Sequence, residues 1–107
     1  MDVRALIQRN QDRMNALYAS QDQTARYESL AEAFRTHFGG EPELFVSAPG
    51  RTEVVGNHTD HNNGRVLAAS VNLDTVAAIA PRTDGVIELY SEGYDHPFTV
   101  DTADLSV

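Results

Sequence analysis

The sequence predicts an α+β fold in which N-terminal helices are followed by a small, largely antiparallel sheet. Apolar residues up to about residue 38 recur at three- and four-residue steps, which is the spacing of one helical face. From residue 44 onward the apolar runs are short, and one of them alternates as a half-buried strand does. Tight-turn signals rather than long crossovers separate these runs, so the strands are expected to pair antiparallel. The length of 107 residues suits one domain.

Two helices are expected at the start of the chain. The first spans about residues 2–18, and its many polar positions predict an extension that docks loosely; a helix that binds a partner is the alternative. The second begins near Asp22, which offers an N-cap, and ends at the glycine stop signal Gly39-Gly40. Both amphipathic faces are expected to pack on a sheet.

The second half of the chain is expected to form short strands. The runs are Leu44–Val46, Val66–Val71, Asp74–Pro81, Val86–Tyr90 and Phe98–Val100. A hairpin turn at residues 83–85 is expected to lead into the fourth run. No element that would close the fold follows residue 101, so the chain is expected to be part of a larger protein.

The composition is acidic and lacks two reactive residue types. The net charge is −8, and all eight basic residues are arginines. An acidic surface repels phosphates and anionic lipids, so neither nucleic acid nor a membrane is an expected partner. The absence of lysine excludes a Walker-type phosphate loop, and the absence of cysteine excludes disulfides and thiolate metal sites. No apolar run approaches the ~20 residues that span a bilayer and no leader opens the chain, so a cytoplasmic protein is expected.

The chemically richest stretch follows the first predicted strand. Its start, Ala48-Pro49-Gly50-Arg51, is expected to be a tight bend that fixes Arg51, because proline restricts φ and glycine permits unusual backbone angles. Residues 54–56 are apolar and are expected to anchor the stretch in the core. Residues 57–60 then supply an amide, an imidazole, a hydroxyl and a carboxylate in succession, before the turn signal at 62–64. Such convergent donors and acceptors suit a polyhydroxylated ligand.

Residue types alone leave alternatives open. The stretch could be an ordinary polar hairpin loop, in which Asn, Asp and Thr side chains satisfy backbone groups. His58, Asp60 and His61 have suitable donors for a metal ion, but their spacing is no recognised zinc pattern. Residues 57–59 also match the N-glycosylation sequon. A Ser/His/Asp hydrolase is disfavoured because no nucleophile elbow is present.

The stretch resembles the galactokinase motif, within the wider group of sugar, homoserine, mevalonate and phosphomevalonate kinases. The family pattern reads approximately A-P-G-R-V-N-L-I-G-E-H-T-D-Y-N-x-G, and residues 48–64 read A-P-G-R-T-E-V-V-G-N-H-T-D-H-N-N-G. The likeness covers about residues 27–94. The resemblance therefore implies two parts, a helical extension at 1–21 that many members lack and, at 22–107, the truncated galactose-binding N-terminal segment of a two-domain kinase.

The resemblance also implies a role for each matching residue, and it assigns none to a metal. Arg51 would be both catalytic and substrate-binding, because the family's arginine lies beside the reacting sugar hydroxyl and the transferred phosphoryl group. Ser91 would lie on the nucleotide side. The residues that would bind sugar hydroxyls or support their loop are Asn57, His58, Thr59 and Asp60.

Three departures from the family pattern matter for the site. Asn57 stands where the family has glutamate, which exchanges a charged acceptor for a neutral amide and bears on the affinity and choice of sugar. Glu53 replaces asparagine, and His61 replaces tyrosine. Galactose or a related hexose is the expected ligand.

Several parts of the family pattern have no counterpart in the sequence. These are the phosphate loop P-x-G-x-G-L-S-S-S-A, a downstream catalytic aspartate and a C-terminal domain. The chain alone is therefore expected to be inactive and to hold no cofactor, whereas the full-length enzyme would use ATP and Mg to make galactose 1-phosphate. The alternative is a stand-alone sugar-binding or dimerisation module, with a homodimer formed through an uncovered sheet edge or face.

Overall fold

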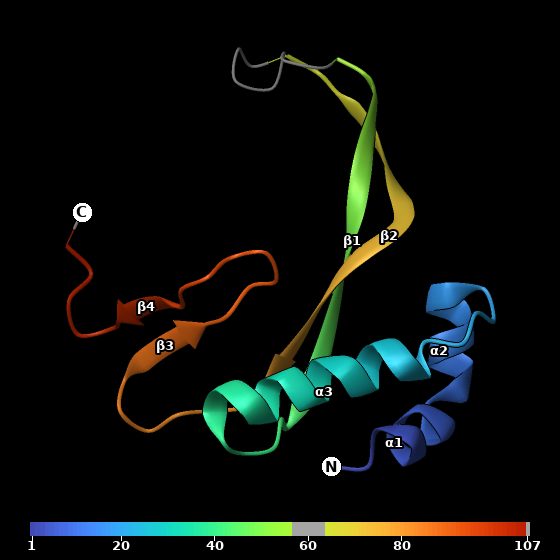
Figure 1. The fold of residues 1–107 in the computed structure, drawn as a ribbon. Coiled ribbons are helices and arrows are strands. Elements are labelled where there is room, and N and C mark those ends of the chain that lie inside the picture. Colours follow the sequence, from blue (N-terminus) through green and yellow to red (C-terminus); the bar gives the residue numbers. More distant parts are fainter. Residues whose placement is uncertain (57–63, 107) are drawn as a thin grey trace.

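The computed structural model describes residues 1–56 and 64–106, and in this part three helices precede four strands. The helices are α1 (Val3–Arg9), α2 (Gln11–Tyr18) and α3 (Thr24–Phe38). The strands are β1 (Leu44–Val55), β2 (Leu67–Ile79), β3 (Val86–Leu89) and β4 (Phe98–Asp101). β1 pairs antiparallel with β2, and β3 pairs antiparallel with β4, in two separate sheets (Figure 1). The predicted α+β class is confirmed, but the expectation of one sheet is wrong.

The predicted first helix is broken into α1 and α2 at Asn10. This residue has φ −113° and ψ 27°, outside the helical region, and its side-chain amide donates to the carbonyl of Leu6 at 2.8 Å. Asparagine competes in this way with the backbone hydrogen bonds of a helix. Apolar spacing continues across the break, so the pattern alone predicts a single helix.

The predicted limits of α3 agree with the structure. The Asp22 carboxylate accepts from the backbone N–H of Thr24 at 2.9 Å, although Gln23 occupies the cap position itself. Gly39 ends the helix with φ 72°, and its N–H donates to the carbonyl of Arg35 at 2.8 Å. With 15 residues, α3 is shorter than a bilayer span, and no helix in the described part of the chain is long and apolar enough to cross a membrane.

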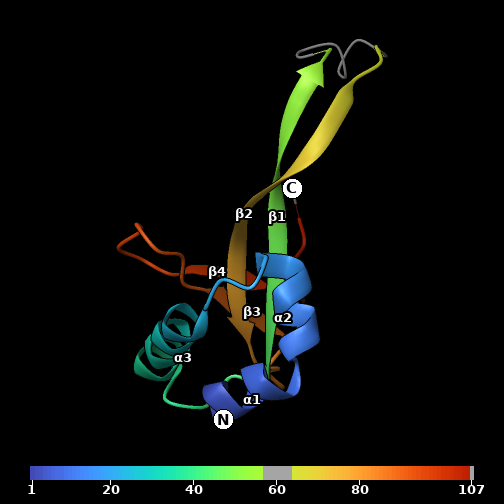
Figure 2. The ribbon, with the colours of Figure 1, turned by 90° about the vertical axis from the view of Figure 1, so that its right-hand side faces the viewer.

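The core lies where the helices meet the base of the β1–β2 hairpin (Figure 2). Its buried apolar residues, among those described, are Val3, Ile7, Tyr18, Tyr27 and Ala31. Phe45 of β1 and Val76 of β2 pack against this group from one face of the hairpin. Val3 is only 4% exposed and Ile7 8%, so the expectation that the N-terminal helix docks loosely is wrong.

The far half of the hairpin extends beyond the helices. Val54, Val55 and Leu67 are 60–63% exposed, so the expectation that residues 54–56 anchor in the core is wrong. The radius of gyration is 17.5 Å, compared with about 13 Å for a compact domain of this size. The helices cover only the base of the hairpin, and the rest of the hairpin extends into solvent (Figure 1).

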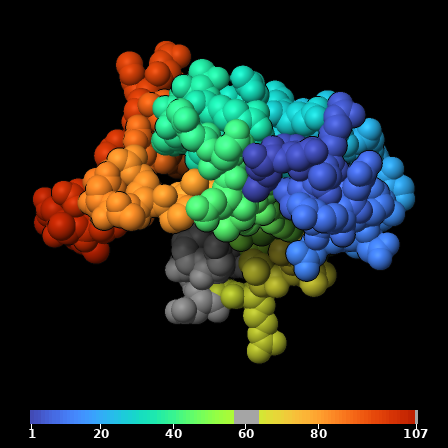
Figure 3. Space-filling model, turned by 90° about the horizontal axis from the view of Figure 1, so that it is seen from below, coloured from blue at the N-terminus to red at the C-terminus, as the bar shows by residue number. Residues whose placement is uncertain are grey.

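The β3–β4 sheet forms a lobe of its own, the orange-to-red part of Figure 3. The turn at residues 83–85 was expected to join paired strands, but β3 pairs with β4 and not with β2. Tyr90 attaches the lobe to α3, because its ring stacks on His37 with a centroid distance of 4.0 Å and meets Phe38 edge-on. One face of the lobe is apolar and about half exposed, and it consists of Ile87, Leu89, Phe98 and Val100.

Ala31 tests the packing of the core, because its side chain is 0% exposed. Ala31→Leu should lower the free energy of unfolding by about 1–3 kcal/mol, since a larger side chain overpacks the site. Ala33→Leu is the matched control on the exposed side of the same helix, and it should change stability little. Denaturant unfolding followed by circular dichroism measures both, and equal losses would contradict the core described above.

Candidate functional site

The A-P-G-R motif lies inside strand β1 and forms no tight bend. Pro49 pairs with Asp74 and Arg51 pairs with Ser70, so a two-residue step on β1 faces a four-residue step on β2. The extra residues make a bulge on β2, and the expectation of a bend in β1 is wrong. Gly50 allows the side chain of Val71 on β2 to lie close to β1, because a Cβ at residue 50 would lie 3.2 Å from a methyl carbon of Val71.

Arg51 directs its guanidinium into solvent. Its side chain is 72% exposed, and a guanidinium nitrogen lies 3.7 Å from a carboxylate oxygen of Glu53. That distance is too long for a hydrogen bond, so the attraction is that of two nearby charges. Arg51 is thus a charged donor on the uncovered half of the hairpin.

Gly56 and Arg65 bring the two ends of the polar segment together. Gly56 has φ 92°, and a Cβ there would lie 2.3 Å from the carbonyl oxygen of Arg65, so only glycine fits without a shift of the backbone. The predicted sugar-binding residues Asn57, His58, Thr59 and Asp60 lie outside the described residues, and so do His61 and the start of the 62–64 turn.

Ser91 lies in the loop between β3 and β4, whereas Arg51 lies on β1 of the other sheet. It is exposed, and its carbonyl accepts from the backbone N–H of Tyr94 at 3.2 Å. The structure assigns Ser91 to a turn of the β3–β4 lobe, separate from the hairpin that carries Arg51.

Sequence reasoning missed a polar group at the base of the hairpin, here called the Asp74 cluster: Tyr18, Arg26, Tyr27, Ser47 and Asp74. The Asp74 carboxylate accepts from Tyr18 Oη at 2.7 Å, Ser47 Oγ at 2.5 Å and an Arg26 guanidinium nitrogen at 2.7 Å. The Tyr27 hydroxyl lies 2.7 Å from that of Tyr18. These contacts join α2, α3, β1 and β2 at one carboxylate.

The cluster changes the ionisation of its members. Burial raises the pKa of Asp74, but the hydrogen bonds from Ser47, Arg26 and Tyr18 outweigh this effect, and the net pKa lies below the ordinary 3.8. Burial and the hydrogen bond with Tyr18 raise the pKa of Tyr27. Asp74 is therefore ionised and Tyr27 neutral at neutral pH. An aspartate at an inward-facing strand position was the signal in the sequence that could have revealed the cluster.

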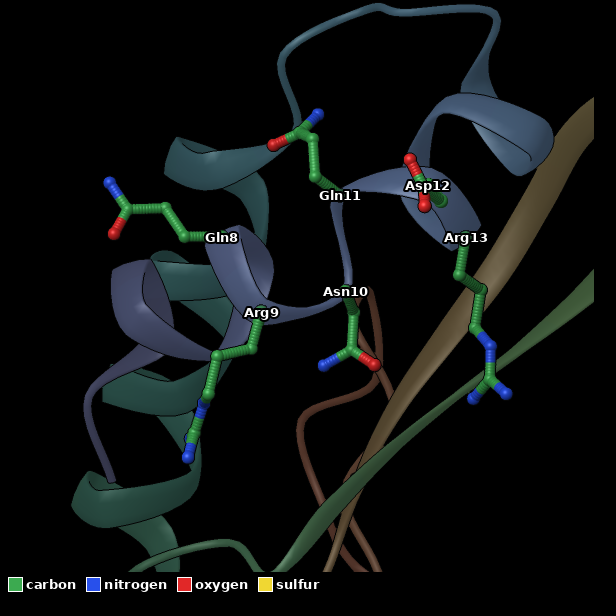
Figure 4. A pocket seen from close by; sticks show the side chains of 6 residues that line it. All are labelled: Gln8, Arg9, Asn10, Gln11, Asp12 and Arg13. Carbon is green, nitrogen blue, oxygen red and sulfur yellow. The ribbon is translucent and has the colours of Figure 1, made fainter.

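The described residues offer no other candidate site. Residues 1–56 and 64–106 contain no group of three or more histidine, aspartate or glutamate side chains placed to hold a metal ion. The hypothetical site at His58, Asp60 and His61 lies outside these ranges. A shallow hollow at the α1–α2 junction is lined by Gln8, Arg9, Asn10, Gln11, Asp12 and Arg13. Figure 4 shows Gln8 and Arg13 pointing away from each other, so this hollow has no convergent set of polar groups.

Comparison with known proteins finds a family signature that includes the β1–β2 hairpin. Residues 32–81 match a family model described as the galactokinase galactose-binding signature. The matched segment contains the second half of α3 with all of β1 and β2. The signature is that of a class of sugar kinase. Over this segment the chain is similar to the galactose-binding region of galactokinases.

Similarity to whole galactokinases extends beyond the signature. The chain is 53% identical to the Homo sapiens galactokinase over 75 residues, which are 65% of this chain and 19% of the human protein. It is 39% identical to the Streptomyces coelicolor galactokinase over 79 residues, which are 73% of this chain and 20% of that protein. The chain thus spans about a fifth of the length of these relatives.

Gly56 tests the closure of the hairpin end. Gly56→Ala should destabilise the end of the hairpin by about 1–2 kcal/mol, because the new Cβ meets the Arg65 carbonyl and the backbone angle is left-handed. Faster hydrogen exchange at the paired residues Val55 and Leu67 would show this loss. Gly40→Ala is the control, since Gly40 has an ordinary φ and no atom within 4 Å of the added carbon. Equal exchange in both variants would contradict the close contact.

Proposed function

We propose that this chain is the galactose-binding portion of an ATP-dependent galactokinase. The observation that carries the proposal is the match of residues 32–81 to the galactose-binding signature, on the same hairpin that exposes Arg51. In this proposal residues 22–107 form the sugar-binding segment, and residues 1–21 form an extension packed against it.

The proposed roles follow from the chemistry of each side chain. Arg51 carries a permanent positive charge and five N–H donors, so it binds the reacting hydroxyl and stabilises negative charge that develops beside it. The Asp60 carboxylate accepts from two adjacent sugar hydroxyls. Asn57 and His58 complete the polar contacts with the sugar, and Thr59 supports the loop. Asn57 is a neutral acceptor, so its hydrogen bond is weaker than that of the family's glutamate.

The residues of this chain do not fit the nucleotide or its metal ion. The sequence has neither lysine nor a glycine- and serine-rich phosphate loop, and the described residues contain no group of three or more histidine, aspartate or glutamate side chains placed to hold a metal ion. Ser91, which the resemblance assigns to the nucleotide side, lies in the β3–β4 loop, away from the sheet that carries Arg51. The proposed activity of this chain is therefore sugar binding, whereas phosphoryl transfer to galactose belongs to the whole enzyme.

Galactose binding tests the proposal directly. The chain should bind galactose with a dissociation constant in the millimolar range, because an exposed hairpin can surround only one side of the sugar. In ¹H–¹⁵N NMR titrations, galactose should shift the amide resonances of Arg51 and of residues 57–60. Asp60→Ala should abolish these shifts by removing the charged acceptor.

Asp95→Ala is the control for this experiment, since Asp95 is an exposed carboxylate in the β3–β4 loop. It should leave binding unchanged. Absence of sugar-induced shifts in the unaltered chain, or unchanged binding by Asp60→Ala, would overturn the proposed function.

A second candidate function is self-association, and the apolar face of the β3–β4 lobe favours it. Ile87 faces Val100 and Leu89 faces Phe98, with 46–57% of each side chain exposed. A two-stranded sheet is marginally stable alone, so burial of this face against a second copy would stabilise it.

Leu89→Lys tests self-association. Sedimentation equilibrium should show a concentration-dependent dimer that Leu89→Lys dissociates, because the change places a charge in the apolar face. Leu105→Lys is the control, since Leu105 is 71% exposed and lies outside that face. A chain that stays monomeric at several hundred micromolar would exclude this second candidate.

A further inference from the structure

We propose that Asp74 is a positioning residue of the sugar site: it holds the strand register that sets the direction of Arg51. The inference rests on the proposed function, because the direction of Arg51 matters for binding only if the hairpin binds sugar. Asp74 itself lies at the base of the hairpin, among groups from the helices.

The position of Asp74 in the register is the first step of the argument. Asp74 pairs with Pro49 at the last regular pair before the bulge, and regular pairing resumes at Arg51 and Ser70. Pro49 has no N–H and donates nothing to the ladder at this point. A one-residue slip in a sheet moves every side chain beyond it to the opposite face. The register at Pro49 therefore decides on which face Arg51 lies.

The hydrogen bonds to Asp74 stabilise the register at the point where Pro49 leaves a ladder hydrogen bond out. Ser47 donates to the carboxylate from β1, two residues before Pro49, so this bond crosses the two strands next to the bulge. Arg26 donates both to the carboxylate at 2.7 Å and to the backbone carbonyl of Asp74 at 3.0 Å. Both the side chain and the backbone of Asp74 are thus fixed, and the carboxylate is only 10% exposed.

The N-terminal helices take part in this arrangement. Tyr18 at the end of α2 donates to Asp74, so the Tyr18 hydroxyl accepts from Tyr27 of α3. Tyr18 and Arg26 both precede residue 32, where the match to the galactose-binding signature begins. Helical residues outside the signature therefore hold β2, the strand that pairs with the one carrying Arg51.

Because Asp74 is charged, its contribution to the stability of the fold depends on pH, and the sign of this dependence follows from its pKa. The pKa of Asp74 is lowered in the folded chain, where Tyr18 faces it from α2, Arg26 and Tyr27 from α3, and Ser47 from β1. A lowered pKa stabilises the fold above the ordinary value of 3.8 and loses this effect as the pH falls through the folded value. The stabilisation by the Asp74 charge is thus present at neutral pH and lost only in acid.

The experiment compares local with overall effects in the 107-residue chain. Asp74→Asn should shift the amide resonances of Gly50, Arg51 and Ser70, and it should raise their hydrogen-exchange rates about tenfold, the loss expected for a charge-assisted hydrogen bond. Exchange at Ala31 in α3 should change much less. The protection factors of these hairpin amides, which correct for the intrinsic exchange rate, should fall below about pH 4 in the unaltered chain but not in Asp74→Asn.

Two further variants keep the test decisive. Tyr18→Phe removes one hydroxyl, keeps the ring, and should shift the same resonances by a smaller amount; it decides the matter if Asp74→Asn fails to fold. Asp84→Asn is the control, because Asp84 accepts from Arg82 in an exposed turn before β3, outside the Asp74 cluster, and it should leave Arg51 unchanged.

The outcomes separate the inference from the proposed function. Unchanged Arg51 resonances in Asp74→Asn and Tyr18→Phe, or a uniform rise of exchange across the chain, would overturn the positioning role. Galactose titration of the unaltered chain is the separate arm: no sugar-induced shift there overturns the proposed function alone. Where the chain binds galactose, Asp74→Asn should raise the dissociation constant at least about fivefold while the helices remain folded.

Discussion

The carboxylate of Asp74 is the contact on which the arrangement of the chain depends. It is the point at which α2, α3 and both strands of the hairpin meet, through donors on Tyr18, Arg26 and Ser47. A nearly buried carboxylate is costly unless every lone pair is satisfied, and here three side chains share that task. The apolar core beside it is small, so this polar junction contributes much of what fixes the helices on the sheet.

The Asp74 cluster lies at the base of the hairpin, and the other half of the hairpin is not covered by the helices. The helices end before the bulge, and from Arg51 to Gly56 the strand is mostly exposed. A ligand site needs this separation, because groups that bind a sugar must be free of other partners while their backbone is held firmly. In the proposed function, the stable base supplies the register and the exposed half supplies the groups that bind the sugar.

Features set by short-range interactions could be predicted from the sequence, and those set by contacts between distant residues could not. Gly39 ends α3 because a left-handed angle suits glycine, which is a local property. The A-P-G-R stretch reads as a bend by the same local rules, yet pairing with β2 keeps it extended. Asp74 also escaped notice, since its role appears only when Tyr18, 56 residues away in sequence, lies beside it. At the site, the type of each polar residue was readable, whereas the exposure of Arg51 required the structure.

The substitution at Glu53 bears directly on how Arg51 can act. A carboxylate 3.7 Å from the guanidinium attracts it without a hydrogen bond, so the arginine is kept near the strand but its five donors stay available. A bidentate pair would have to be broken before a ligand could bind, at the cost of a charge-assisted hydrogen bond. A distant pair needs only a change of side-chain rotamer. In the proposed function, Glu53 limits the range of directions of Arg51 while leaving its donors available to a sugar hydroxyl.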